Sequence, residues 1–360
     1  FWDRFSDQSF FLFENSITAK DYYQFGFHQK SLTKQDKRRY LGSYQDWRIF
    51  RYINNDRQAC DLLDDKLRFS DFARGGAIRV PEILALISTR PGRDGGTAPK
   101  TIGSREEFVA WIETCPLESF VLKPLDGVKG DGVKSIGKKP PENTLRELPG
   151  AETTTADALW SFYEVFLDTT DILIQERLKP HPVLQRIMPD VLHTVRIVTH
   201  GSDPVSLIDA VLRVGRGQGA ADNLAKGGLM VPIDMTTGVC GQPTMIVDGV
   251  PQAQDDHPVT GTRITGTPVP DWEAACDTAV RAAHLFNQHR SVGWDIALTD
   301  EGAVLLEGNW HYDLGVNQVA HRKGILALSW SDVFIAEQAH KHAGFGLAKI
   351  CSGSAMRPDP

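Results

Sequence analysis

The 360-residue sequence lacks the patterns that mark several large classes of protein. No C-x-x-C pair occurs, and the cysteines are odd in number and widely spread, which indicates reduced thiols rather than a disulfide framework or a zinc site. The five cysteines are Cys60, Cys115, Cys240, Cys276 and Cys351. No apolar run reaches the roughly 18–20 residues that a membrane-spanning helix needs. The aromatic segment Phe1 to Phe13 is interrupted by charged residues and is not expected to be a signal peptide. These absences predict a cytoplasmic protein.

Clusters of one charge are missing as well. The formal net charge is -7, and lysine and arginine are scattered along the chain. This distribution argues against a nucleic-acid-binding stripe and against a basic patch for membranes, so small molecules are the expected partners. The length allows two or three lobes, each with a hydrophobic core. The sequence does not indicate an oligomeric state.

Helical and extended patterns are mixed without strict alternation, which predicts an α+β fold. Residues 1–64 are expected to form several short helices, residues 65–174 a first lobe and residues 175–350 a second. The expected helices are Leu63–Arg74, Arg105–Thr114 behind a Ser104 capping box, Ala156–Leu167, a helix capped by Asp271 that reaches His289, and Ser331–Lys341. The expected strands are Ile78–Leu84, Ser119–Pro124 and Asp171–Glu176, with hairpins His193–His200/Val205–Val214 and Val292–Thr299/Ala303–Glu307. Loops are expected at Arg90–Lys100 and Lys138–Thr155.

The strongest chemical pattern is an acidic hairpin in GWDIALTDEGAVLLEGN, residues 293–309. A three-residue loop with a left-handed Gly302 would pair Thr299 with Ala303 and place Asp295 opposite Glu307, with Asn309 on the same face. The other face, with Trp294, Ile296, Leu298, Val304 and Leu306, is expected to be core.

Opposed carboxylates destabilise a sheet unless something neutralises them. A hard cation with oxygen ligands does so, and Asp295, Glu307 and Asn309 are therefore the candidate metal ligands. A solvated hairpin face is the simpler alternative for the same residues.

A lysine stands inside the apolar strand that ends at Pro124, and a glycine-rich run follows it. Gly127, Gly130 and Gly132 allow backbone N–H groups to approach phosphate oxygens, and Lys123 supplies a positive charge. The spacing is neither that of a Walker A loop nor that of a dinucleotide-binding fingerprint. A glycine-rich turn with solvated lysines remains the alternative.

Taken in this order, the motifs resemble the ATP-grasp superfamily, and in particular its sugar-transfer-associated branch, which is related to glutamate-ligase-like enzymes. The resemblance covers the chain from about Leu62 to the last helix, and it implies two α/β lobes that clasp ATP. It also implies ATP and Mg²⁺ as cofactors, with two magnesium ions and with Mn²⁺ as an alternative.

The resemblance assigns roles to individual residues. It implies phosphate contacts for Lys66 and Lys123, and a glycine loop that covers the phosphates. It implies that the hinge strand 172–178 holds adenine and ribose through Gln175, Glu176, Arg177 and Leu178. Arg196 and Arg213 resemble the arginines that face the phosphates and the acyl intermediate, and both are alternatively structural ion-pair partners. The segment with Asn223, Gly227 and Gly228 resembles a substrate loop.

His311 follows the acidic trio closely and is a candidate substrate contact, although a surface loop explains it more simply. Two parts of the family pattern are not found: a second ribose-binding carboxylate after the hinge, and an N-terminal α/β lobe. The implied activity is an ADP-forming carboxylate–amine ligase that works through an acyl phosphate. A kinase on the same frame and a non-catalytic nucleotide-binding module are the alternatives, and no substrate is identified.

Overall fold

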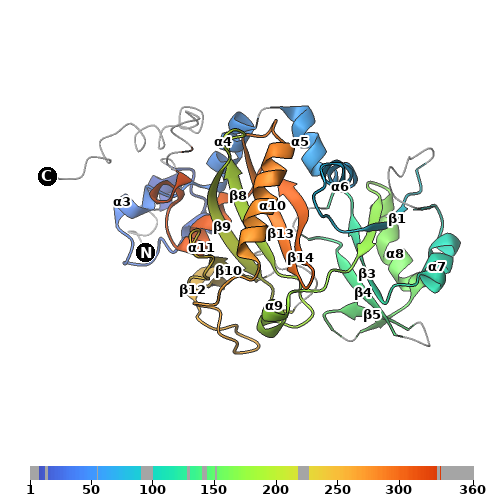
Figure 1. Ribbon diagram of the computed structural model, residues 1–360. Helices are drawn as coiled ribbons and strands as arrows, with labels where there is room; N and C mark the ends of the chain where they lie inside the picture. The colour runs from blue at the N-terminus through green and yellow to red at the C-terminus, as the bar shows by residue number, and fades with distance from the viewer. Residues whose placement is uncertain are drawn as a thin grey trace.

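The computed structural model describes residues 8–12, 15–54, 56–90, 100–127, 130–139, 144–150, 152–217, 227–330 and 333. Within these residues the chain forms two seven-stranded sheets that lie side by side, with helices on their faces (Figure 1). The expected α+β class is therefore confirmed. None of the helices in the described part is long and apolar enough to cross a membrane.

The N-terminal region consists of short helices, as expected: α2 (Ala19–Gln24), α3 (Lys34–Lys37), α4 (Ser43–Ile53) and α5 (Arg57–Asp64). Capping boxes fix the first two helix starts, because Thr18 pairs with Asp21 and Thr33 with Asp36. The helix expected from Leu63 is wrong at its start. Asp65 ends α5 and caps α6 (Lys66–Gly75), so a helix break falls just before Lys66.

The first sheet has the strand order β2-β1-β7-β3-β4-β5-β6. Its strands are β1 (Ile83–Ile87), β2 (Thr101–Ile102), β3 (Ser119–Pro124), β4 (Lys134–Lys139), β5 (Thr144–Leu148), β6 (Thr153–Thr154) and β7 (Ile172–Glu176). Helices α7 (Arg105–Thr114) and α8 (Ala156–Leu167) pack on one face, where they share a core with Phe120, Leu122 and Ile174. Leu67 of α6 packs on the other face against Leu173.

Two expectations for this sheet have opposite outcomes. The helix Arg105–Thr114 is confirmed, with the Ser104 side chain accepting a hydrogen bond from the Glu107 amide. The loop expected over Lys138–Thr155 is wrong, because β5 and β6 lie there. Leu145 enters the core while its neighbours stay half-exposed, so this mostly polar strand at the sheet margin resembles a loop in composition.

The second sheet has the order β12-β11-β10-β9-β8-β13-β14. Its strands are β8 (Thr194–His200), β9 (Ser206–Val214), β10 (Leu229–Pro232), β11 (Thr244–Val247), β12 (Val250–Ala253), β13 (Ser291–Thr299) and β14 (Gly302–Asn309). Helix α10 (Trp272–Leu285) covers one face, and α11 (Leu314–His321) packs on the other against Val211 and Met230 (Figure 1). The short α9 (Pro182–Ile187) follows β7.

Both hairpins expected in this sheet are present, as β8–β9 and β13–β14. The expected cap of α10 is wrong: Asp271 has left-handed backbone geometry and makes no side-chain capping bond, and the helix ends at Leu285 rather than near His289. The expected last helix, 331–341, lies outside the described residues apart from position 333.

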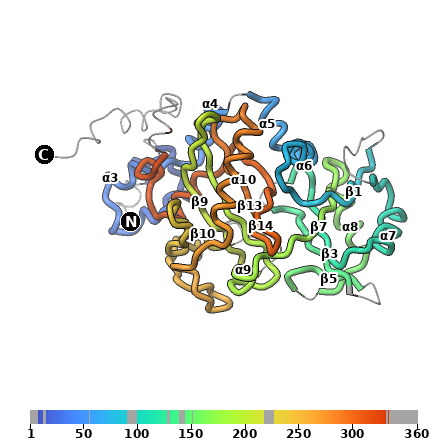
Figure 2. Tube along the Cα trace, viewed as in Figure 1, coloured from blue at the N-terminus to red at the C-terminus, as the bar shows by residue number. Residues whose placement is uncertain are grey.

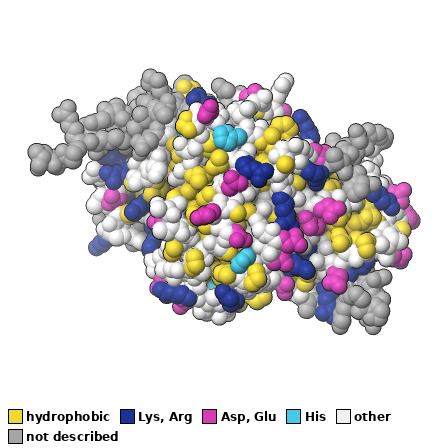
Figure 3. Space-filling model, viewed as in Figure 1, with side chains coloured by type: hydrophobic (Ala, Val, Ile, Leu, Met, Phe, Trp, Pro, Cys, Tyr) yellow, Lys and Arg dark blue, Asp and Glu magenta, His cyan; other side chains and the backbone are white. Residues whose placement is uncertain are grey.

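Segments distant in sequence meet where the two sheets adjoin. The trace in Figure 2 brings α5 and α6 beside β14, and Leu63 and Phe69 of these helices share the core of the second sheet. Strand β7 crosses the lobe boundary expected at residues 174–175 and belongs to the first sheet. On the face seen in Figure 3, lysine and arginine side chains are interspersed with aspartate and glutamate.

Candidate functional site

The acidic pair lies on the β13–β14 hairpin. Asp295 stands opposite Glu307 in the strand register. The expected turn is wrong, because Thr299 pairs with Gly302 and the loop has two residues instead of three. A β-bulge beside Asp295 leaves Leu306 as an extra residue, and this insertion restores the alignment. The register expected for the two acids thus arises from a shorter turn and a bulge.

The shorter turn also changes which side chains enter the core. Leu305 packs with Trp294 beneath α10. Val304 was expected in that cluster but packs with Leu178 and Ala297 instead. The shift by one residue follows from the shorter turn.

Two arginines neutralise Asp295, which is only 1% exposed. Arg196 donates from Nε to Oδ1 at 2.7 Å and from Nη2 to Oδ2 at 2.8 Å. Arg213 Nη2 lies 2.8 Å from Oδ2. Burial alone would raise the pKa of Asp295, but the two guanidinium groups hold it well below its usual range. Arg196 and Arg213 therefore do form structural ion pairs, as the alternative interpretation expected, and their partner is an acid of the candidate site.

Burial, reinforced by the charge of Asp295, raises the pKa of Glu307. Asn309 completes the trio, because its Nδ2 lies 3.4 Å from Asp295 Oδ2 and 3.4 Å from Glu307 Oε1. Carboxylate and amide oxygens are the donors that Mg²⁺ prefers, and an added cation would relieve the repulsion within this pair. The three side chains thus fit a magnesium site. Among the described residues, this site included, no group of three His, Cys, Asp or Glu side chains is arranged for a metal, so the candidate site depends on Asn309 as its third donor.

Two lysines approach the acids from the first sheet and its helix. Lys123 on β3 is half-buried, and its ammonium group makes no hydrogen bond to any described residue. Burial, followed by the charge of Lys66, lowers the pKa of Lys123 to about 8. The charge of Glu307 acts on both lysines. Residues from both sheets and from α6 therefore form one charged cluster.

Lys66 anchors the base of the glycine loop. Its Nζ donates to the carbonyl oxygens of Leu125 at 2.9 Å and Gly127 at 2.8 Å. Its position at the first turn of α6 follows from the Asp65 cap. Lys66 is thus within reach of the loop that the sequence singled out.

The described part of the glycine loop requires glycine for two physical reasons. Gly130 and Gly132 both have φ of 70°, which disfavours other residues. A Cβ at Gly132 would also lie 2.7 Å from Pro124 Cγ. Tyr163 of α8 supports this backbone by donating to the Gly132 carbonyl at 2.8 Å. Residues 128–129 lie outside the described part.

The side chains of the hinge residues make contacts within the protein. Glu176 Oε1 accepts from the Glu82 amide at 2.9 Å, and Arg177 Nε donates to Ser135 Oγ at 2.9 Å. Gln175 is buried, and Leu178 packs against β13 and β14. Of these contacts, only that of Leu178 reaches the second sheet, and adenine binding at the hinge stays a prediction.

The expected substrate residues are dispersed. Gly227, with φ of 78°, and buried Gly228 precede β10, while Asn223 lies outside the described residues. His311 lies beyond β14, with its Nε2 4.0 Å from Asp46 Oδ2 of α4.

Sequence reasoning missed Thr194, which fixes Arg213. Thr194 Oγ1 accepts from Arg213 Nε at 2.9 Å and from Nη2 at 2.6 Å. The two residues are directly paired across β8–β9, so the correct hairpin register could have revealed the contact.

The family model described as sugar-transfer-associated ATP-grasp matches residues 48–330. The chain belongs to the sugar-transfer-associated ATP-grasp family. The resemblance expected from the sequence is confirmed, and so is the ATP-grasp fold. No curated protein matches the chain.

Solved structures similar to this ATP-grasp chain include ligases of low identity. L-amino acid ligase from Bacillus licheniformis is 9% identical with a TM-score of 0.37, over 74% of this chain and 44% of that one. D-alanine–D-alanine ligase from Bacillus anthracis is 9% identical with a TM-score of 0.42, over 82% and 70%. D-alanyl-alanine synthetase A from Vibrio cholerae O1 is 10% identical with a TM-score of 0.44, over 79% and 66%. This chain thus matches less than half of the Bacillus licheniformis enzyme.

Proposed function

We propose that this ATP-grasp protein is an ATP-dependent carboxylate–amine ligase that forms an amide through an acyl phosphate and releases ADP and phosphate. The observation that supports this most strongly is the charged cluster at the junction of the sheets. Lys66, Lys123 and Arg213 lie around an acid pair, Asp295 and Glu307, that a divalent cation would neutralise. Such a combination suits a triphosphate that carries magnesium.

The cations on the side of the first sheet would bind phosphate. Lys123 has no hydrogen-bond partner within the described residues, so its ammonium is available to an oxyanion. Lys66 would hold the glycine loop through Gly127 and lie beside the same phosphates. Backbone N–H groups at Gly130 and Gly132 would complete a cradle of the kind that binds anions in other proteins.

Asp295, Glu307 and Asn309 would hold the metal, with Mg²⁺ as two ions or Mn²⁺ in its place. The metal would supply positive charge at the β- and γ-phosphates. Because Asp295 already binds both arginines, Glu307 is the ligand with the greater freedom to bind a cation. The arginines would remain close to the reacting phosphate.

In the reaction, an oxygen of the substrate carboxylate forms a bond to the γ-phosphorus of ATP, and the bond to the ADP oxygen breaks. The amine nitrogen then attacks the acyl carbon, phosphate leaves, and the amine loses a proton. Arg213, held by Thr194, would stabilise the oxyanion of the second step. Closure of the glycine loop would exclude water and prevent wasteful hydrolysis of the acyl phosphate.

The test is release of ADP and phosphate from Mg²⁺-ATP with pooled amino acids, with and without amine acceptors. Hydroxylamine in place of the amine would trap the acyl phosphate as a hydroxamate. ADP with free phosphate and hydroxamate supports the ligase. A stable phosphorylated product would instead identify a kinase, and tight ATP binding without any turnover of the pool would favour a binding module.

A further inference from the structure

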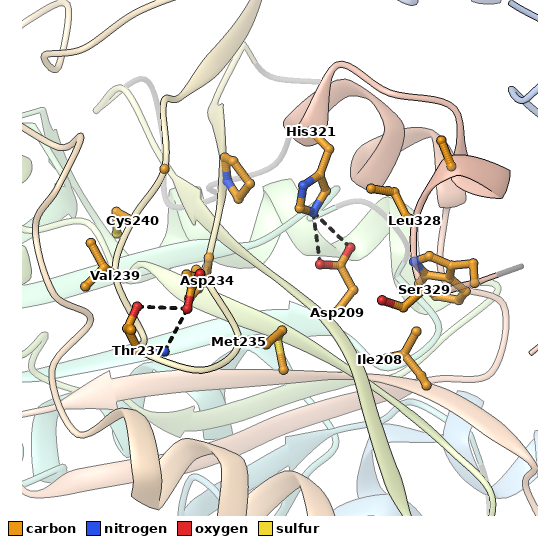
Figure 4. A pocket seen from close by; sticks show the side chains of 15 residues that line it. Ile208, Asp209, Asp234, Met235, Thr237, Val239, Cys240, His321, Leu328 and Ser329 are labelled. Atoms are coloured by element: carbon orange, nitrogen blue, oxygen red, sulfur yellow. Dashed lines mark hydrogen bonds and ion pairs between the residues drawn. The ribbon is translucent and has the colours of Figure 1, made fainter. Parts of the chain in front are cut away.

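A pocket with a volume of about 780 Å³ lies away from the charged cluster. Its walls come from β9, from the segment that follows β10, from the end of α11 and from residues 327–330 (Figure 4). This volume is within the range of small-molecule sites. The proposed ligase reaction makes no use of it.

The pocket is separated from the candidate active site by packed side chains. Asp209 in the pocket wall and Arg213 in the charged cluster stand on the same face of β9, four residues and therefore about 13 Å apart. Between them Val211 packs against Met230 and against Val316 of α11. A ligand in the pocket would not reach the reacting atoms, so the pocket is a site of its own.

One wall contains a histidine that a buried carboxylate orients. Asp209 is 5% exposed and lies 2.9 Å from His321 Nε2 through its Oδ1. Its Oδ2 accepts from Asn317 Nδ2 at 2.7 Å. This contact fixes the orientation of the His321 ring in the pocket wall. The other ring nitrogen, Nδ1, makes no hydrogen bond within the described residues and is available to a ligand.

A second acid comes from the segment after β10. Asp234 Oδ1 accepts from the Thr237 amide at 2.8 Å and from its hydroxyl at 2.9 Å, as Figure 4 shows. Hydrogen bonds from Thr237 lower the pKa of Asp234, which keeps its carboxylate ionised at neutral pH. No lysine or arginine is among the described residues that line the pocket. The lining therefore favours ligands that donate hydrogen bonds and disfavours anions.

The pocket also contains a thiol, but one unsuited to covalent chemistry. Cys240 is 3% exposed, and burial raises its pKa to about 12. The thiolate form, which is the nucleophile, is therefore negligible at neutral pH. Ile208 and Met235 add apolar surface to the walls. These groups suit reversible binding.

We propose that this pocket binds a small molecule that bears an amine together with hydroxyl groups. The Asp234 carboxylate recognises the ammonium group, and the His321 ring, oriented by Asp209, forms a hydrogen bond with a hydroxyl. The apolar walls contact the carbon skeleton of the ligand. Since the pocket lies outside the reaction site, binding does not depend on ATP.

The probe is glucosamine, titrated calorimetrically into the full chain without ATP. Glucose tests the contribution of the amine, and glucose 6-phosphate tests the exclusion of anions. Two variants address the pocket: Ala327→Trp, which fills it from an exposed lining position, and Asp234→Asn, which removes charge but keeps an acceptor for Thr237. Asp248→Asn is the matched control, since Asp248 is exposed in the β11–β12 turn and does not line the pocket.

Glucosamine is expected to bind the wild type and Asp248→Asn equally, about tenfold more weakly to Asp234→Asn, and not measurably to Ala327→Trp. Glucose should bind more weakly than glucosamine, and glucose 6-phosphate more weakly still. The proposal is overturned if the wild type does not bind glucosamine, if glucose 6-phosphate binds as well, or if both pocket variants bind like the wild type. None of these results bears on the ligase assay, which is measured separately.

Discussion

The two sheets present their positive charges in different ways. On the first sheet, the ammonium of Lys123 makes no hydrogen bond within the described residues, and the neighbouring Lys66 of α6 donates to the backbone carbonyls of Leu125 and Gly127. On the second sheet, Arg196 and Arg213 both bind the carboxylate of Asp295 at 2.7–2.8 Å. The first sheet therefore offers charge to a ligand, whereas the second uses its charge to hold its own structure together.

Because of this difference, substitutions on the first sheet should mainly affect ligand binding, and substitutions on the second should also affect stability. Loss of a lysine on the first sheet would remove a proposed interaction with a ligand and would leave no buried acid without a partner. Loss of Asp295 leaves two nearly buried guanidinium groups unpaired, which is costly in a folded protein. The charges of the second sheet are thus expected to matter for folding as well as for the reaction, and Glu307 is the acid least committed to the protein.

The largest expected effect is on turnover in Glu307→Gln. Removal of this carboxylate would take away the freest metal ligand, and ADP formation is expected to fall on the order of 10³-fold, with the fold intact by circular dichroism. Glu301→Gln is the matched control on the same hairpin, because Glu301 is exposed in the turn and its side chain forms an ion pair with Arg79 away from the site. Near-wild-type turnover in Glu307→Gln would refute the metal assignment.

Stability is the measurement for Asp295→Asn. The substitution breaks a buried pairing with two arginines, and the free energy of unfolding is expected to fall by about 3–5 kcal/mol in urea denaturation. Glu301→Gln breaks an exposed ion pair and is expected to cost at most about 1 kcal/mol. Equal losses in the two variants would contradict the distinction between the sheets.

The third expected effect is a pH dependence of ATP affinity, caused by the titration of Lys123. Its pKa of about 8 in the free protein would rise when phosphate binds, so ATP affinity is fully present below pH 8 and declines as the pH rises through it. The dissociation constant is expected to increase about tenfold between pH 7 and pH 9. Lys123→Arg keeps its charge over this range, and its affinity should stay flat. A decline of the same size in that variant would assign the titration to another group.

Much of this arrangement could be predicted from the sequence, because local patterns dictate it. The Ser104 cap, the apolar strand around Lys123 and the strands of both hairpins each follow from patterns of neighbouring residues. The clustering of Lys66 with Lys123 and Glu307 came from the family resemblance, since no local pattern joins residues so far apart. The β5 strand was missed because its polar composition resembles a loop.

Other features depend on geometry that the sequence does not display. Burial of Asp295 beneath two arginines requires knowledge of which strands are neighbours, and β8 lies beside β13 across a gap of about a hundred residues in the chain. The contact of Thr194 with Arg213 depends on a register across β8–β9. The pocket at Asp209 and His321 joins a strand to the end of a helix that packs on it.

The smallest expected effect tests how the acid pair is aligned. Leu306 is the extra residue of the bulge, between Leu305 in the core and Glu307 at the site. Because strand residues alternate in direction, deletion of Leu306 would leave Leu305 inward and Glu307 on the site face, in a regular ladder. Mn²⁺ affinity, measured by electron paramagnetic resonance, is therefore expected to change by less than about fivefold (about 1 kcal/mol). Deletion of Leu305 is the contrasting variant, since it removes a buried side chain and requires Leu306 to enter the core in its place. A complete loss of metal binding on deletion of Leu306 would mean that the bulge itself, through its local twist, is needed to bring the two carboxylates together.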